Sequence, residues 1–443
     1  MTVVTATMVG AVIGTTLALP LALLPGMHAY NVLALLVLAF HSLPPGWHAG
    51  VAPCAVPAVA AMLTTYVFVS AIPAIFLAAP DDSALFTVRP GQAALQRGRG
   101  FEAVMLTALG TAVALAVALP AAATFVPHFL PPLYSVLRPH THWILWCIIV
   151  LMLQSEWPRA YPGLRPGWRW FFLANRSCFV GAATFLLAGC LGMLIMWSRL
   201  LPPRHAFQGL LPAFLGLFTL PQLLLDLAAR TPAPPQSRAC EPIRLPELAH
   251  GTLAGLLGGG IAAFLPVVTG GVGGWLAGHA TALRNSRAFL VSQGAARSVY
   301  YVGALLLFVT PPLYLVRGGA AWMLQAFLVP TGRTPLYQAV AAAALAGAVC
   351  VVLLGPLTAG VTAILARFGR PRVGLVTLAL CVVLTFAVTG VVGLGILVVA
   401  TAIGLLPLLY ESRRMNCLGV IMLPIACSMS GLAPTLAKLL RLT

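Results

Sequence analysis

The residues of this chain that could do chemistry gather beside breaks in long apolar runs. The stretch "LPLALLPGMHAYN" reaches Pro25 and Gly26 and then carries His28, Tyr30 and Asn31. Proline and glycine interrupt helices, and inside a membrane an interrupted helix survives only within protein or beside water. The half-helix after such a break presents unpaired N–H groups and a partial positive charge of about half a unit. We therefore expect this break to help bind an anion, although a simple kink is the alternative.

A second break of the same kind lies just past the middle of the chain. In "GGGIAAFLPVVTGGVGGW" an apolar run stops at Pro266 and continues through Thr269, Gly270 and Gly271. Pro266 follows Pro25 by 241 residues in a chain of 443, which is the spacing that an internal duplication gives. We expect the two breaks to meet near the membrane midplane, as tips related by a pseudo-two-fold axis.

A third interruption adds the acidic residues. Pro73 and Pro80 bracket a short apolar run, and Asp81, Asp82 and Ser83 follow directly. Two interpretations stay open. The segment turns back as a re-entrant hairpin and carries the acids to a cavity beside the first break, or the acids cap the next helix from the membrane surface.

The candidate cations for an anionic ligand are three arginines and the histidines near the breaks, His28, His41, His48 and His279. Arg284 and Arg287 stand in "RNSRAFLVSQGAAR", and Arg297 lies deeper, in "GAARSVYY". A charge at membrane depth costs about 2.5 to 3.5 kcal/mol on insertion scales, so it is normally paired or functional. The apolar span around Arg297, residues 289–316, contains no acid. We expect Asp81 or Asp82 to pair with Arg297 until an anion replaces it, whereas Arg284 and Arg287 have the alternative of snorkelling to the interface.

The composition predicts the elements that position these residues. Of 443 residues 60% are hydrophobic and 7% are charged, which is typical of an integral membrane protein. Apolar windows recur along the whole chain, and we expect an all-α polytopic fold with about 10 to 12 transmembrane helices. We expect a first membrane repeat at 1–229, a polar proline-rich linker at 230–247 and a second, inverted repeat at 248–443, with interrupted helices or re-entrant hairpins.

Charge and cysteine content exclude several other classes. The net charge of +17 is spread over short loops such as "RPGQAALQRGRG" and "PRAYPGLRPGWRW", which is explained by orientation in a membrane and predicts no nucleic-acid partner. We expect a multi-pass protein of the inner cell membrane. Nine cysteines without a C-x-x-C pair indicate neither a disulfide framework nor a zinc site. We expect no cofactor and no metal site. The coupling ion, Na⁺ or H⁺, and the formation of a homodimer stay open.

Several stretches resemble one family in the same order along nearly the whole chain. "SAIPAIFLAAPDDSA" is similar to a signature of the large membrane subunit of the tripartite tricarboxylate transporters, and "LALLPGMHAYN" and "GGGIAAFLPVVTGG" resemble its Pro-Gly motif and a second copy of it. "RAFLVSQGAARSVYYVGALLLF" and "YESRRMNCLGVIMLPI" are similar to a divergent, single-chain, permease-like branch. The resemblance implies a duplicated fold, paired re-entrant hairpins and one substrate site moved by alternating access.

One departure from that family concerns the substrate. Where its members usually have Asn-Thr-Pro-Gly, this chain has Ala78, Ala79, Pro80 and Asp81, which removes two polar contacts and adds a negative charge. A tricarboxylate would be repelled there. We therefore expect a secondary-type permease for a different anionic substrate.

Two other functions are alternatives to the permease. A flippase for a polyprenyl phosphate or another phosphorylated lipid carrier would use the same half-helix ends and arginines. An intramembrane transferase would need two Asp-rich clusters, and Asp81 with Asp82 is the only acidic pair, so we do not expect an enzyme.

Overall fold

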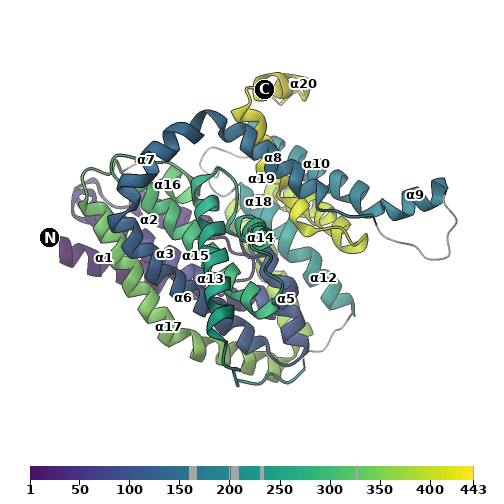
Figure 1. Ribbon diagram of the computed structural model, residues 1–443, viewed down its shortest axis with the longest axis horizontal. Coiled ribbons are helices and arrows are strands. Elements are labelled where there is room, and N and C mark those ends of the chain that lie inside the picture. The colour runs from purple at the N-terminus through teal and green to yellow at the C-terminus, as the bar shows by residue number, and fades with distance from the viewer. Residues whose placement is uncertain (159–166, 199, 201–208, 230–233, 326–327, 443) are drawn as a thin grey trace. The chain divides into compact units, whose positions relative to one another are not determined.

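The protein is helical throughout its described part. The computed structural model describes residues 1–442 except 159–166, 199, 201–208, 230–233 and 326–327 (Figure 1). Among those residues every element is a helix and none is a strand, which confirms the expected all-α membrane architecture. Residues 230–233, at the start of the expected linker, lie outside the described residues. Residues 159–166, most of an arginine-rich loop, also lie outside them.

Two compact units divide the chain, and each takes segments from both sequence halves. Unit 1 contains residues 1–138 and 230–377, and unit 2 contains residues 139–229 and 378–443. This division does not test the repeat boundaries expected at 229 and 248, because one repeat can contribute to both units.

Unit 1 begins with helices interrupted where the sequence predicts breaks. Its first segment contains α1 (Val3–Leu21), α2 (Ala29–His41), α3 (Pro45–Val69), α4 (Ala71–Phe76), α5 (Leu85–Gln96), α6 (Gly100–Thr124) and α7 (Val126–Leu137). Its second segment contains α13 (Leu245–Phe264), α14 (Gly270–Ala280), α15 (Ser286–Val309), α16 (Gly318–Leu324), α17 (Thr334–Phe368) and the first residues of α18 (Arg370–Leu409).

The two segments of unit 1 repeat one pattern of helices and breaks. Helices α2 and α14 begin 241 residues apart, at Ala29 and Gly270, and α3 and α15 begin with the same offset. The break before each half-helix contains a left-handed residue at matching positions, Gly26 with φ 68° and Val267 with φ 52°. Because a β-branched residue rarely adopts such a φ, its surroundings must hold it there. The match supports internal duplication, and the inverted orientation of the halves stays a prediction.

Small residues let the long helices of each segment approach closely. A Cβ added at Gly14 of α1 would lie 2.0 Å from the carbonyl oxygen of Ala58 in α3, and one at Gly255 of α13 would lie 2.6 Å from that of Ser292 in α15. Helices in membranes pack through such small faces. The two segments also pack on each other through matching pairs of helices. Helix α3 of the first segment packs on α17 of the second, and α15 of the second packs on α6 of the first. Figure 1 shows α13 and α15 side by side in this unit.

Unit 2 is a second set of apolar helices. It contains α8 (Thr141–Gln154), α9 (Trp168–Ala174), α10 (Arg176–Trp197), α11 (Leu210–Phe214), a π-helical turn η3 (Leu215–Thr219), α12 (Leu220–Ala229), the rest of α18, η4 (Arg414–Leu418), α19 (Gly419–Met429) and α20 (Ala433–Leu439). Its buried acid, Glu156, accepts hydrogen bonds from the backbone N–H of Arg413 (2.6 Å) and from Nδ2 of Asn416 (2.9 Å). These contacts tie the end of α8 to η4.

Eight helical segments of the described chain are long and apolar enough to cross a membrane. A ninth span is formed if the pair Arg414–Met429 and Ala433–Leu439, bent by 117°, counts as one. The expected number was 10 to 12. Helices α13 and α15, with 20 and 24 residues, also have the length of a crossing, but their glycines and polar residues lower their hydropathy.

Candidate functional site

The first break ends in a histidine that caps the half-helix after it. Residues 22–28 separate α1 from α2, and His28 is the extended N-cap residue of α2. Its Nδ1 accepts a hydrogen bond of 3.0 Å from the backbone N–H of Tyr30. This cap satisfies one of the N–H groups that every helix N-terminus leaves unpaired.

The second break ends in the matching way with a threonine. Thr269 is the extended N-cap residue of α14, and its hydroxyl accepts from the backbone N–H of Val272 at 3.5 Å. The next two residues, Gly270 and Gly271, form the first turn of α14, where N–H groups have no acceptor within the helix. Gly271 lies against the carbonyl oxygen of Ser83, from which a Cβ would stand only 2.6 Å away, so a side chain there would separate α14 from this loop.

The acidic residues lie on a buried loop between α4 and α5. Asp81, Asp82 and Ser83 are at most 5% exposed. One oxygen of Asp81, Oδ1, accepts from the hydroxyl of Ser83 (2.8 Å) and the backbone N–H of Ala84 (2.6 Å). These bonds hold the turn that leads into α5. The burial places the acids inside the protein, and the bond from Ala84 also lets Asp81 cap the turn at the start of α5, so the depth of this loop in the membrane stays a prediction.

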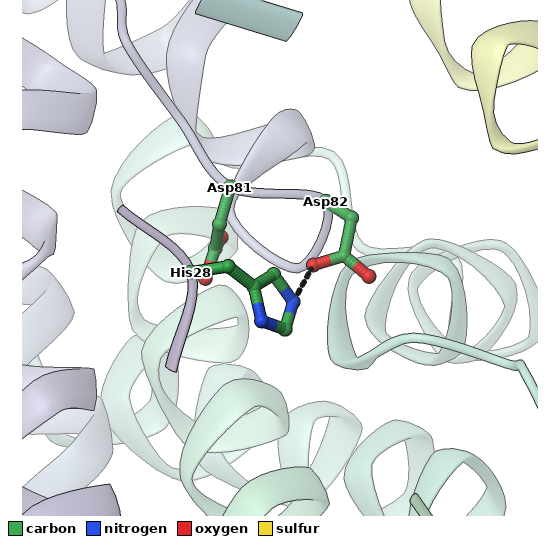
Figure 2. A group of neighbouring side chains, drawn as sticks. All are labelled: His28, Asp81 and Asp82. Carbon is green, nitrogen blue, oxygen red and sulfur yellow. Dashed lines mark hydrogen bonds and ion pairs between the residues drawn. The ribbon is translucent and has the colours of Figure 1, made fainter. Parts of the chain in front are cut away.

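Both half-helix caps contact the same acidic residue. Oδ1 of Asp82 lies 2.7 Å from Nε2 of His28, and Figure 2 shows the two side chains facing each other with Asp81 beside them. The hydroxyl of Thr269 donates to the backbone carbonyl of Asp82 at 3.4 Å. The tips of the two breaks therefore come together on one residue of the third.

Arg297 enters this cluster from α15. Its side chain is completely buried and donates from Nε to the hydroxyl of Ser83 (3.0 Å) and from Nη2 to that of Ser70 (2.7 Å). Nη2 also lies 3.6 Å from Oδ2 of Asp81, so the expected acid from another segment is Asp81. The other terminal nitrogen, Nη1, has no hydrogen-bond partner among the described residues. An incoming anion could bind there without first breaking a bond.

Four tyrosines surround the charged groups, and three of them were missed in the sequence. Oδ2 of Asp81 accepts from the hydroxyls of Tyr66 (2.7 Å) and Tyr301 (3.1 Å). The hydroxyls of Tyr30 and Tyr300 lie 3.1 Å apart. Tyr300 and Tyr301 had a signal, because they follow Arg297 by about one helical turn, whereas the single tyrosine of α3, Tyr66, and its C-cap residue, Ser70, had none.

The cluster also contains a set of ligand atoms at metal-binding distance. One atom each from His28, Asp81 and Asp82 lie within 4.8 Å of one another. However, Nε2 of His28 and Oδ1 of Asp82 already bond to each other, and both oxygens of Asp81 accept hydrogen bonds. A metal ion there would also meet the guanidinium of Arg297. We therefore assign no metal ligands to this cluster.

Other buried polar groups lie near the breaks. Pro25, Gly26 and Pro80 are buried within their breaks. Asn31, in the first turn of α2, is buried, and its Nδ2 has no partner among the described residues. The same holds for both amide atoms of Gln293, which precedes Arg297 by one turn of α15 and was missed in the sequence.

Arg284 and Arg287 do not lie in this cluster. Arg284 is exposed, and Arg287 belongs to an ion-pair group at the start of α15. Its guanidinium lies 3.2 Å from Glu102 of α6 and donates to the backbone carbonyl of Glu241 in the linker (2.7 Å). Arg99 contacts both acids, and they raise the pKa of its guanidinium. The described part of the linker is thus bound to both segments of unit 1.

The comparisons with known proteins place the chain in a family. Neither the curated proteins nor the solved structures contain a match to it. The family model described as the tripartite tricarboxylate transporter TctA family matches residues 5–419, so this multi-pass membrane protein belongs to that transporter family.

Proposed function

We propose that the protein is an inner-membrane permease that moves an anionic substrate by alternating access, with its substrate site at the meeting point of the three breaks. The main support for this proposal is the environment of Arg297. This residue is fully buried, it lies beside the first turn of a half-helix, and its Nη1 is unpaired among the described residues. A buried charged group with an unsatisfied donor is destabilising, so the unpaired Nη1 of Arg297 favours a ligand that accepts a hydrogen bond from it.

The substrate anion would bind between Arg297 and the start of α14. The N–H groups of Gly270 and Gly271 and the guanidinium are all donors, and a Cβ at Gly270 would stand 2.9 Å from the Cα of Arg297. A carboxylate or phosphate accepts from such donors, and a guanidinium can bind it in a bidentate way. Asn31, whose Nδ2 has no partner among the described residues, adds a neutral donor at the first tip, and Thr269 caps the half-helix at the second.

Asp81 would act as the counter-anion of the empty site. It lies 3.6 Å from Nη2 of Arg297 and is held by hydroxyl and backbone donors. When an anion neutralises Arg297, Asp81 loses part of its electrostatic attraction to that side chain. Because Asp81 belongs to the loop and Arg297 to α15, the exchange would change how these elements hold together, as alternating access requires.

Transport by purified protein in proteoliposomes tests this function. Radiolabelled citrate, inorganic phosphate and a polyprenyl phosphate serve as three probes, because a soluble carboxylate, a soluble phosphate and a lipid phosphate share the chemistry that Arg297 would recognise. Movement of a soluble probe supports the permease, and movement of the lipid alone supports the flippase alternative. Failure of all three contradicts the proposed class of substrate.

Variants of Arg297 connect transport to the site. Arg297→Ala should lower the apparent affinity by about tenfold to a hundredfold, the loss expected for hydrogen bonds to a charged group, and Arg297→Lys should restore only part of it. Arg287→Ala, on the same helix but outside the cluster, is the matched control and should transport normally. The double variant Arg297→Ala/Asp81→Asn avoids an unpaired buried acid and must also fail. Full transport by Arg297→Ala would refute the assignment.

A further inference from the structure

The two ring nitrogens of His28 have different and fixed roles. Nδ1 accepts from the backbone N–H of Tyr30, and because an N–H can only donate, Nδ1 carries no proton in this arrangement. The neutral ring then carries its proton on Nε2, which lies 2.7 Å from Oδ1 of Asp82 (Figure 2). His28 thus links the cap of α2 to an acid of the substrate cluster.

The charges that face His28 make a second proton favourable when an anion arrives. Asp81 and Asp82 face it from the loop between α4 and α5, and Arg297 approaches from α15. In the described part of the chain, the hydroxyls of Tyr30 (α2), Tyr66 (α3), Tyr300 and Tyr301 (α15) also lie around this group. With His28 neutral, two carboxylates and one guanidinium leave one net negative charge. A bound anion would increase this charge, and an added proton would cancel one unit of it.

We propose that His28, paired with Asp82, binds the proton that couples to anion transport, and that protonation releases the cap on α2. The proposal rests on the proposed anion transport, and it assigns the coupling ion. Imidazole is more basic than a carboxylate, so the added proton goes to Nδ1 of His28. A protonated Nδ1 cannot accept from Tyr30. The positive ring is also repelled by the N-terminus of α2 and attracted by Asp82. The loss of the cap bond and the new positive charge therefore both move the ring away from α2 and toward Asp82.

The second half-helix supplies an internal control. Thr269 occupies the matching cap position of α14, and its hydroxyl does not titrate in the physiological range. Only α2 should therefore respond to pH. A His28→Thr variant gives α2 the cap residue that α14 already has, so it keeps a capping oxygen and loses the proton site.

Hydrogen–deuterium exchange measured on the full chain in lipid nanodiscs tests the cap. Lowering the pH from about 8 to about 5 should protonate His28. After correction for the intrinsic pH dependence of amide exchange, peptides covering 28–34 should exchange about fivefold faster at the lower pH, since a helix cap contributes about that factor. Peptides covering 269–275 should not change. His28→Thr should abolish the response of α2. An unchanged wild type, or a response that persists in His28→Thr, overturns the proposal.

Proton movement in proteoliposomes gives the second test. Citrate and inorganic phosphate are offered in turn to vesicles loaded with the pH dye pyranine, and entry of whichever probe the wild type moves should carry protons with it. In His28→Thr, entry of that probe should no longer respond to a pH gradient. If the probe enters the wild-type vesicles without protons, the coupling proposal is wrong while the transport function stands. If no anion enters, the transport function fails, and the exchange measurement still decides whether His28 is a proton-sensitive cap.

Discussion

Replacing Asp81 with asparagine should destabilise the empty protein and make it depend on a bound anion. Asp81 is buried, and its two oxygens accept from Tyr66, Tyr301, Ser83 and the backbone N–H of Ala84. An asparagine has one side-chain oxygen, so it can accept either from the two tyrosines or from Ser83 and Ala84, but not from all four donors. It also leaves the guanidinium of Arg297 without a carboxylate. Removing one partner of a buried ion pair costs about 3 to 5 kcal/mol, because the other charge stays buried and unpaired.

The result depends on whether an anion can replace the missing carboxylate. Thermal unfolding of purified Asp81→Asn should show a lower midpoint than that of the wild type. Citrate or phosphate should raise the midpoint of the variant by more than it raises the midpoint of the wild type. A ligand at a hundred times its dissociation constant stabilises by about 2.7 kcal/mol. Glu241→Gln is the control, since that carboxylate is 62% exposed and its ion pairs contribute at most about 1 kcal/mol. Equal midpoints for Asp81→Asn and wild type, with equal responses to anions, would show that Asp81 is not the counter-anion of Arg297.

Two further substitutions test the site and the packing around it. Gln293→Leu should stabilise the protein without a bound anion by about 1 to 3 kcal/mol, because it removes a buried amide that has no partner among the described residues. The same substitution should weaken binding of the transported anion, and an unchanged affinity would show that Gln293 is not at the site. Gly255→Ala should lower the unfolding midpoint, at a cost of about 1 to 3 kcal/mol, because its Cβ would lie 2.3 Å from that of Ala295. Gly260→Ala on the same helix meets no atom within 4 Å and should be neutral or stabilising, so equal effects of the two alanines would contradict the close packing of α13 on α15.

The breaks and the buried arginine could be predicted because each violates a rule of membrane helices. Pro25 with Gly26, and Pro266 with the glycines that follow, interrupt apolar runs in which a continuous helix would satisfy every backbone group. Arg297 stands in a span without an acid, so a partner from elsewhere was required. These signals are local and need no knowledge of the tertiary structure.

The partners of these groups could not be predicted, because they come from distant parts of the chain. Ser70 and Tyr66 precede Arg297 by more than 200 residues, and neither residue type is unusual in an apolar helix. The hydrogen bond from the backbone N–H of Tyr30 to Nδ1 of His28 also left no pattern in the sequence. Arg287 looked like a ligand for an anion, but its partners are Glu102 and the linker residue Glu241, whose approach depends on how the linker folds.

A structure of the chain in lipid nanodiscs with a transported probe anion bound would show directly whether Arg297 binds the substrate. We expect density for the anion within hydrogen-bond distance of Nη1 of Arg297 and next to the first turn of α14, with Oδ2 of Asp81 farther than 3.6 Å from Nη2. A compact density would indicate a small carboxylate or phosphate, and a long apolar tail would indicate a lipid. An anion bound elsewhere, with the pair of Arg297 and Asp81 unchanged, would contradict the assignment of the substrate site to Arg297.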